Sequence, residues 1–121
     1  MRWLLLLPLL AACDAFTAPA DARPYIPPPE FTGLWQRVEQ CSGHSGDFAR
    51  VRWYVTDGPL ELDGTAKAGV WEKPHSIYML ESYIVDAYRD YVAVRHEMIH
   101  DLTQSGAHGH EFTDCDALTL N

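Results

Sequence analysis

The chain has 121 residues, of which 17 are acidic and 9 are basic, so its formal net charge is −8. This length holds one small domain, and no internal repeat divides it. The acidic balance and the lack of a basic patch exclude nucleic acid as a partner, because binding to phosphates requires clustered Lys and Arg. We expect a monomer whose modest core gains stability from a cross-link or a metal ion.

The first residues have the pattern of an export signal. Met1 and Arg2 form a short positive region, and residues 3–10 form an apolar region that is too short for a stable membrane span. Residues 10–13, Leu-Ala-Ala-Cys, resemble the lipobox of bacterial lipoproteins. The resemblance implies a signal peptide over residues 1–12, lipid attachment at Cys13 and a location in the cell envelope, anchored to a membrane on its periplasmic side. The alternatives are an ordinary cleaved signal and an uncleaved anchor.

The next stretch is rich in proline. Residues 13–30 contain five prolines and few large apolar residues. Proline favours extended polyproline II backbone and blocks helices, so we predict a lipidated, extended tether over residues 13–30. The domain is then expected to occupy residues 31–121.

Within this domain the apolar patterns predict helices and strands in an α+β arrangement. The predicted elements are, in chain order, a short helix over residues 34–40 with Thr32 as its N-cap, a strand over 51–56, a weak strand over 65–71, a strand over 76–81 and a helix over 88–102. Gly106 is expected to end the last helix in a left-handed turn. The expected fold is a small twisted sheet packed on the last helix, together with the short N-terminal helix.

The cysteine count is consistent with export. Without Cys13, the remaining pair is Cys41 and Cys115, which can form a disulfide in an oxidising compartment. Such a bond would close a loop of about 75 residues and stabilise the fold by about 4 kcal/mol in the chain-entropy model. The alternatives are two free buried thiols or two zinc ligands.

The most informative motif lies in the predicted last helix. His96 and His100 are four residues apart and therefore project from one helix face, at the spacing with which two imidazoles share a Zn²⁺ ion. Glu97 lies about 60° around the helix from His100, where it can take a proton from a water molecule. His108 and His110 follow, and either can supply a third ligand. The alternative is a helix whose two histidines are merely exposed.

The segments His96-Glu97-Met98-Ile99-His100 and His108-Gly109-His110-Glu111-Phe112 resemble the catalytic core of the SprT-like (Spartan) metallopeptidases. In that family an HEMIH motif is followed by a His-Gly-Pro-Glu-Phe block whose histidine binds zinc. The resemblance covers about the last 30 residues and implies His108 as the third ligand, while His110 stands where the family has proline and remains a competitor. The metzincin spacing is excluded because Thr103 and Gly106 occupy positions where it requires glycine and histidine.

Other residues are weaker candidates. In zincins the strand before the active-site helix borders the cleft, which implies a substrate-binding edge at Ile77, Tyr78, Met79 and Leu80; an ordinary sheet strand is the alternative. Asp101 is a candidate to hold the second ring nitrogen of a ligand histidine. The candidates to steady an oxyanion are Tyr78, Tyr83, Tyr88, Tyr91 and Arg95.

These features together predict an exported, membrane-anchored zinc metallopeptidase with a minimal zincin-like α+β domain. Its substrate would be a peptide or protein, and Glu97 would act as the general base. The alternative, from a different class, is a non-catalytic zinc-binding or interaction lipoprotein with a structural metal site. A closed site that uses both His108 and His110 would favour that alternative, whereas three ligands and an open position favour catalysis.

Overall fold

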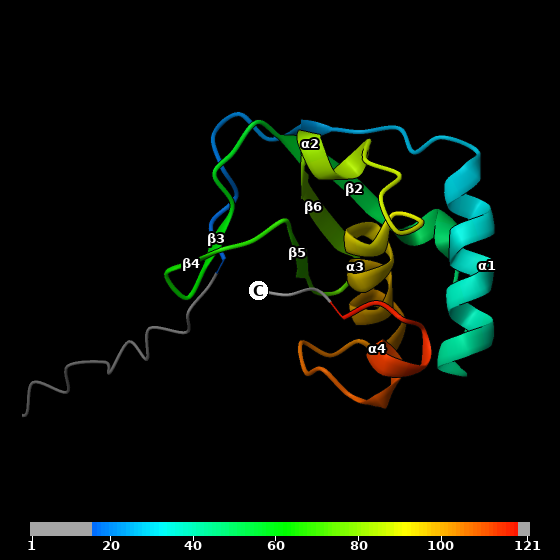
Figure 1. Cartoon of the computed structure of the whole chain (residues 1–121). Helices are drawn as coiled ribbons and strands as arrows, with labels where there is room; N and C mark the ends of the chain where they lie inside the picture. Colours follow the sequence, from blue (N-terminus) through cyan, green and yellow to red (C-terminus); the bar gives the residue numbers. More distant parts are fainter. Residues whose placement is uncertain (1–15, 119–121) are drawn as a thin grey trace, which may run out of the picture.

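A four-stranded sheet in the order β1-β2-β6-β5 carries the fold in the computed structural model, which describes residues 16–118 (Figure 1). The elements are β1 (Arg23–Pro24), α1 (Glu30–Ser42), the 3-10 helix η1 (Phe48–Arg50), β2 (Arg52–Thr56), β3 (Glu61–Leu62), β4 (Thr65–Ala66), β5 (Gly69–Glu72), β6 (Ser76–Leu80), α2 (Glu81–Ile84), α3 (Val92–Thr103) and α4 (His110–Asp114). Strands β3 and β4 form a separate hairpin. The predicted α+β class is therefore confirmed.

The central pair of the sheet, β2 and β6, is parallel, and both outer strands run antiparallel to their neighbours. Trp53 pairs with Ile77 and Val55 pairs with Met79, and all four side chains are buried on the face that receives the helices. This face follows from the alternation of apolar residues along both strands. The prediction that 77–80 forms a sheet edge is wrong, because β6 is hydrogen-bonded on both sides and β5 is the outer strand.

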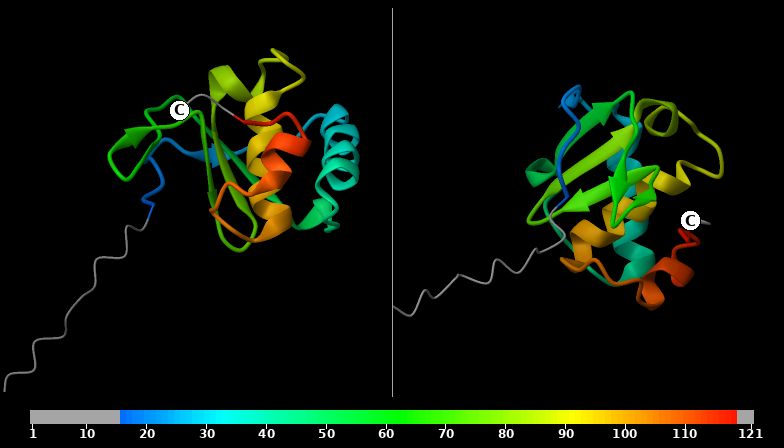
Figure 2. Two further views of the ribbon diagram at one scale, coloured as in Figure 1. Left: turned by 60° about the horizontal axis from the view of Figure 1, so that its bottom comes forward. Right: turned by 90° about the vertical axis from the view of Figure 1, so that its left-hand side faces the viewer.

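Helix α3 lies between the sheet and α1 (Figures 1 and 2). All residues from Ala93 to Leu102 are buried, and Val94, Met98 and Ile99 are fully enclosed. The helix begins at Val92 and not at residue 88, because the three residues before it adopt left-handed backbone with φ between 48° and 56°. It ends where Gln104 adopts φ 52°, so Gly106 is not the residue that stops it.

Helix α1 is longer at its start than the sequence pattern predicts. It begins at Glu30, directly after Pro29, whose restricted φ suits the entrance to a helix, and Thr32 is not its N-cap. Phe31, Leu34, Trp35 and Val38 form its buried face. Gly43, with φ 76°, ends the helix and donates its N–H to the Glu39 carbonyl at 3.1 Å.

The described part of the predicted tether, residues 16–30, belongs to the domain, so that prediction is wrong over this range. Arg23 of β1 pairs with Val55 of β2, and Phe16 packs edge-on against Tyr78 with the ring centroids 4.9 Å apart. The Asp21 carboxylate accepts hydrogen bonds from the Thr56 hydroxyl and from the Asp57 N–H. The prolines permit this packing because an outer strand does not need every N–H.

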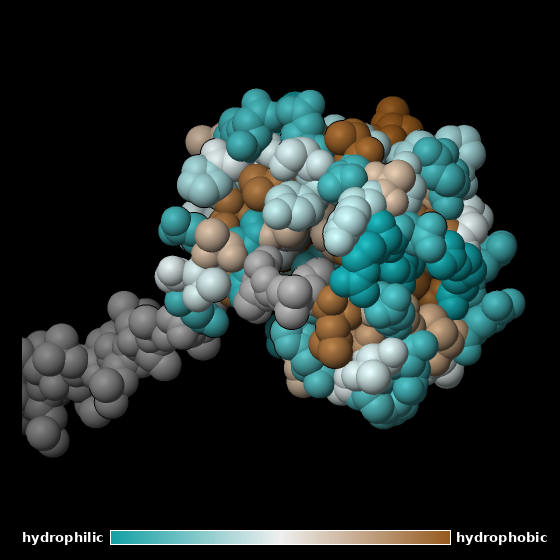
Figure 3. All heavy atoms as spheres, viewed as in Figure 1, coloured by the Kyte–Doolittle hydropathy of each residue, from teal (hydrophilic) through white to brown (hydrophobic). Residues whose placement is uncertain are grey.

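The predicted signal peptide, residues 1–12, and the predicted lipidation site, Cys13, lie outside the described residues. Among residues 16–118 no helix is long and apolar enough to cross a membrane. The face shown in Figure 3 is mostly hydrophilic, with apolar side chains scattered over it, some of them at the top of the view. Within residues 16–118, the exposed large apolar side chains include Ile26 and Val85.

A disulfide joins Cys41 to Cys115, with the Cα atoms 5.2 Å apart. The predicted pairing is therefore present. The bond connects the last turn of α1 to the residue that follows α4. Through it, the N-terminal helix is fixed to the segment that follows His108.

Candidate metal centre

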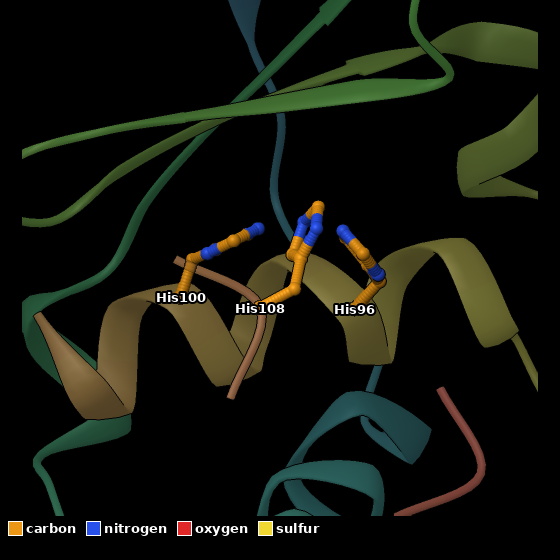
Figure 4. Close-up of side chains that lie close together, drawn as sticks. All are labelled: His96, His100 and His108. Carbon is orange, nitrogen blue, oxygen red and sulfur yellow. The ribbon is translucent and has the colours of Figure 1, made fainter. Parts of the chain in front are cut away.

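Three histidines converge above α3, and together they could hold a metal ion. His96 and His100 project from successive turns of α3, and His108 comes from the loop between α3 and α4 (Figure 4). One ring nitrogen from each residue lies within 4.8 Å of the other two. This is the group that the spacing of His96 and His100 and the resemblance to SprT-like peptidases predicted, with His108 as its third member.

The hydrogen bonds of two of these histidines fix the tautomer that binds a metal. His96 Nδ1 is 2.7 Å from the Ala117 carbonyl oxygen, and His100 Nδ1 is 2.8 Å from that of Ser105. A carbonyl oxygen only accepts, so each Nδ1 carries the proton and each Nε2 keeps a free lone pair. Burial lowers the pKa of His96 to about 4 and also lowers that of His100. Both imidazoles are therefore neutral at neutral pH.

His110, the competing third ligand, is not part of this group. It lies on the first turn of α4, where its Nδ1 donates to the Asp114 carboxylate at 2.8 Å. Its Nε2 lies 3.3 Å from Glu111 Oε2, and its side chain is 75% exposed. The geometry therefore selects His108 over His110.

The Phe112 ring packs against all three imidazoles. This ring is fully buried, and its centroid lies 4.7 Å from that of His96, 4.8 Å from that of His100 and 4.9 Å from that of His108. Aromatic rings at these separations pack favourably, so Phe112 restricts where each imidazole can point. The sequence reasoning assigned Phe112 no role of its own, although a lone large apolar residue in a polar, five-residue helix was a usable signal.

Glu97 is buried beside the histidines. Burial raises its pKa to about 8, and this rise is opposed by the charge of Lys67 and by a hydrogen bond from the Trp71 backbone N–H. Gly69 of β5 passes directly over it: a Cβ on Gly69 would lie 3.0 Å from Glu97 Cγ and 2.5 Å from Met79 Sδ. The absence of a side chain at residue 69 therefore lets β5 approach the face of α3 that carries the histidines closely.

A cavity of about 220 Å³ opens over this group. Strand β5 and the segment before it form one wall, and α3 with the His108 loop forms the other. Its lining residues are Leu62, Lys67, Ala68, Gly69, Val70, Trp71, Ala93, His96, Glu97, His100, Gly106 and His108. None of the five residues suggested as oxyanion donors lines this cavity.

Asp101 holds a tryptophan and not a ligand histidine. Its carboxylate is buried and accepts hydrogen bonds from the Trp71 indole at 3.1 Å and from His75 Nδ1 at 3.2 Å. The Trp71 ring is stacked on that of His100, with an angle of 18° between the planes. Asp101 thus acts on His100 through Trp71, a relation that no local spacing in the sequence indicates.

Arg95 is buried and fastens two segments to α3. Its guanidinium donates to the carbonyls of Arg89 and Asp90 before the helix, at 2.9 and 2.8 Å. It also donates to the carbonyl of Cys115 at 2.7 Å and that of Asp116 at 3.3 Å. The next carbonyl in the chain, that of Ala117, orients His96. Arg95 therefore places the acceptor that sets the tautomer of this ligand.

Comparison with family models, with curated proteins and with solved structures finds no match to this chain. The resemblance to SprT-like peptidases therefore stays a prediction. The assignment of the site rests on the three converging histidines and their hydrogen bonds.

Proposed function

We propose that this protein is a zinc-dependent metallopeptidase. The observation that carries the proposal is the convergence of His96, His100 and His108 in a cavity that also contains the buried Glu97. A general base placed beside an open metal position is the arrangement used in metal-assisted hydrolysis.

The donor set suits zinc in a catalytic role. Imidazole nitrogens are ligands that Zn²⁺ prefers, and catalytic zinc sites use three protein ligands and leave a fourth position open. No fourth His, Cys, Asp or Glu joins the group within residues 16–118. A closed site with both His108 and His110 would favour a structural metal, so the separation of His110 from the group supports catalysis over the non-catalytic alternative.

When bound, zinc would polarise the scissile carbonyl and make water a better nucleophile at neutral pH. Glu97 would accept a proton from the attacking water and pass it to the leaving amine. Its buried position keeps bulk water away from this transfer. Burial raises the pKa of Glu97, and the charge of Lys67 and the Trp71 N–H oppose this rise and so favour the ionised carboxylate that can accept the proton.

The substrate would bind as an extended peptide along β5. This strand has one neighbour, β6, and its other edge is unpaired within the described chain. Gly69, Val70 and Trp71 also line the cavity. A peptide that pairs with β5 would pass over the histidines with alternate side chains directed toward the cavity. This edge replaces the one that the sequence suggested at Ile77–Leu80.

The proposed location is the cell envelope, with a lipid on Cys13 as the membrane anchor. The Cys41–Cys115 disulfide supports an oxidising compartment, because structural disulfides form and persist there. If the anchor is correct, Cys13→Ser abolishes incorporation of a labelled fatty acid in a bacterial host. Labelling that survives in this variant would contradict it.

The function can be tested by metal analysis and peptide hydrolysis with the full chain. We expect one zinc per chain and cleavage of peptides from a mixed library. Glu97→Gln should keep the zinc and lower kcat by about a thousandfold, the scale of general-base catalysis. Glu30→Gln, at the exposed start of α1 and outside the cavity, is the matched control and should remain fully active. Zinc binding without any cleavage by the wild type, or full activity in Glu97→Gln, would refute the proposal.

A further inference from the structure

Lys67 stands in the wall of the proposed active-site cavity. It lies in the short connection between β4 and β5, where its backbone N–H donates to the Leu60 carbonyl at 2.8 Å. Its side chain is half-buried and lines the same cavity as Glu97 and the three histidines. The other lining residues are apolar or glycine, so Lys67 is the only Lys or Arg among the residues that line this cavity.

The charge environment of Lys67 differs from that of most other cations in the protein. Arg23, Arg37, Arg50 and Arg89 each form an ion pair with a carboxylate, and Arg95 donates to four backbone carbonyls. The Lys67 ammonium has no hydrogen bond or ion pair to any described residue, and the carboxyl on which its charge acts is that of Glu97 in the same cavity. Acidic residues outnumber basic ones by 17 to 9 in this chain, so carboxylate partners are abundant elsewhere. A half-buried cation without such a partner is suited to bind an anion from outside.

We propose that Lys67 binds a carboxylate of the substrate, so that the cavity selects peptides with a negative charge close to the scissile bond. This inference rests on the proposed peptidase function and names its substrate class. The carboxylate can be the C-terminus of the peptide or the side chain of Asp or Glu. Both present the same two oxygens to an ammonium group, and a cavity of about 220 Å³ has room for only a short part of a peptide beside the metal position.

The test measures peptide binding apart from cleavage. The full chain carrying Glu97→Gln is loaded with zinc and titrated calorimetrically with three acetylated tripeptides: Ala-Ala-Ala with a free C-terminus, the same peptide as an amide, and Ala-Asp-Ala as an amide. We expect at least one of the two charged peptides to bind about tenfold more tightly than the neutral one, as a charge-assisted hydrogen bond requires. The charged peptide that does so identifies the source of the carboxylate.

Substitution of Lys67 then decides whether this residue causes the preference. Lys67→Met should reduce the difference between charged and neutral peptides to less than about twofold. Lys67→Glu should reverse it, so that Ala-Lys-Ala amide binds more tightly than Ala-Asp-Ala amide. Lys73→Met is the matched control, because Lys73 is the only other lysine and lies exposed in the turn between β5 and β6, outside the cavity. It should keep the full preference.

Two results would overturn the inference: equal binding of charged and neutral peptides by Glu97→Gln, or a preference that survives in Lys67→Met, which would assign the carboxylate to the zinc. A failure of the proposed peptidase function can be told apart from a failure of this inference. A wild-type chain that binds carboxylates through Lys67 but cleaves nothing would refute the peptidase and leave the anion site standing. Cleavage of charged and neutral peptides with the same kcat/KM would refute the role of Lys67 and leave the peptidase function standing.

Discussion

Helices α1 and α3 pack against each other and have similar lengths, 13 and 12 residues, yet they bury their residues in opposite ways. Helix α1 buries one face and exposes the other. Helix α3 buries ten consecutive residues, and five of these are polar or charged: Arg95, His96, Glu97, His100 and Asp101. A buried polar side chain costs free energy unless it has a partner. In α3 Arg95 binds backbone carbonyls, Asp101 accepts hydrogen bonds from the side chains of Trp71 and His75, and the other three line the cavity. These buried polar residues therefore identify α3 as the helix that carries the site, whereas the apolar face of α1 serves packing.

The largest effect on stability is expected from the bond that ties α1 to the site. Replacing Cys41 and Cys115 by serine removes a cross-link between residues 74 positions apart, and the free energy of unfolding should fall by about 4 kcal/mol. Urea unfolding under non-reducing conditions measures this change. The double variant should match the wild type treated with a reductant. A loss below about 1 kcal/mol would show that α1 and α4 hold together without the bond.

Two arginines allow the helices to be compared directly. Arg95→Met should lower the free energy of unfolding by about 3 kcal/mol, because the buried guanidinium and its hydrogen bonds to four backbone carbonyls, one of them buried and three half-buried, are lost. Arg37→Met on α1 removes an exposed ion pair with Asp90 at 3.6 Å and should change it by less than about 0.5 kcal/mol. Urea unfolding of both variants gives the difference. Equal losses would mean that burial in α3 has no special energetic weight.

The choice between two histidines tests the metal centre. His108→Ala should weaken zinc binding by about a hundredfold or more, since it removes a ligand, and loss of a residue that only supports a ligand already costs tenfold or more. His110→Ala should stay within about threefold of the wild type, because His110 contacts Asp114 and Glu111 and not the cluster. Competition with a chromophoric chelator measures both affinities. The opposite order would make His110 the ligand.

The smallest effects are expected in the pH dependence of the metal-free chain. The pKa of Glu97 is raised from 4.5 to about 8, so the folded chain retains a proton that the unfolded chain releases. Its contribution to stability therefore falls as pH rises from 4.5 to 8. The pKa of His96 is lowered from 6.5 to about 4, so its contribution falls as pH drops from 6.5 to 4.

Glu97→Gln separates these two contributions. The variant should lose the decline above pH 6.5. Between pH 4.5 and 6.5 the two contributions oppose each other in the wild type, so the variant should show a steeper loss of stability as pH falls through this range. Urea unfolding in the presence of a chelator, repeated between pH 4 and pH 8, provides the measurement. Identical slopes for wild type and variant above pH 6.5 would show that Glu97 is not the group with the raised pKa.

The features that depend only on the local periodicity of a helix or strand could be predicted from the sequence. The spacing of His96 and His100 on one helix face depends only on the helical period, and the alternation in β2 and β6 depends only on the pleat. The pairing of Cys41 with Cys115 followed from counting. The structure confirms both predictions: His96 and His100 lie together with His108, and Cys41 is bonded to Cys115.

The parts that depend on distant segments were not predictable. The order of strands places β6 inside the sheet, and no pattern within 77–80 distinguishes an inner strand from an outer one. The proline content of residues 13–30 predicted extended backbone, but it did not reveal that, in the described part of this stretch, residues 23–24 pair with β2. The carbonyls of Ser105 and Ala117 that orient His100 and His96 have no side-chain signature, because every residue has a carbonyl.

Gly69 has a consequence for how this sequence can vary. A single added methyl group there would collide with Met79 and press on Glu97, although the backbone of Gly69 does not require glycine for its φ. In a saturation library selected for function, position 69 should therefore tolerate almost no replacement because of its neighbours, whereas Gly33 in α1 has open space around it and no positive φ. The absence of one side chain thus becomes as strict a requirement as the presence of the three histidines.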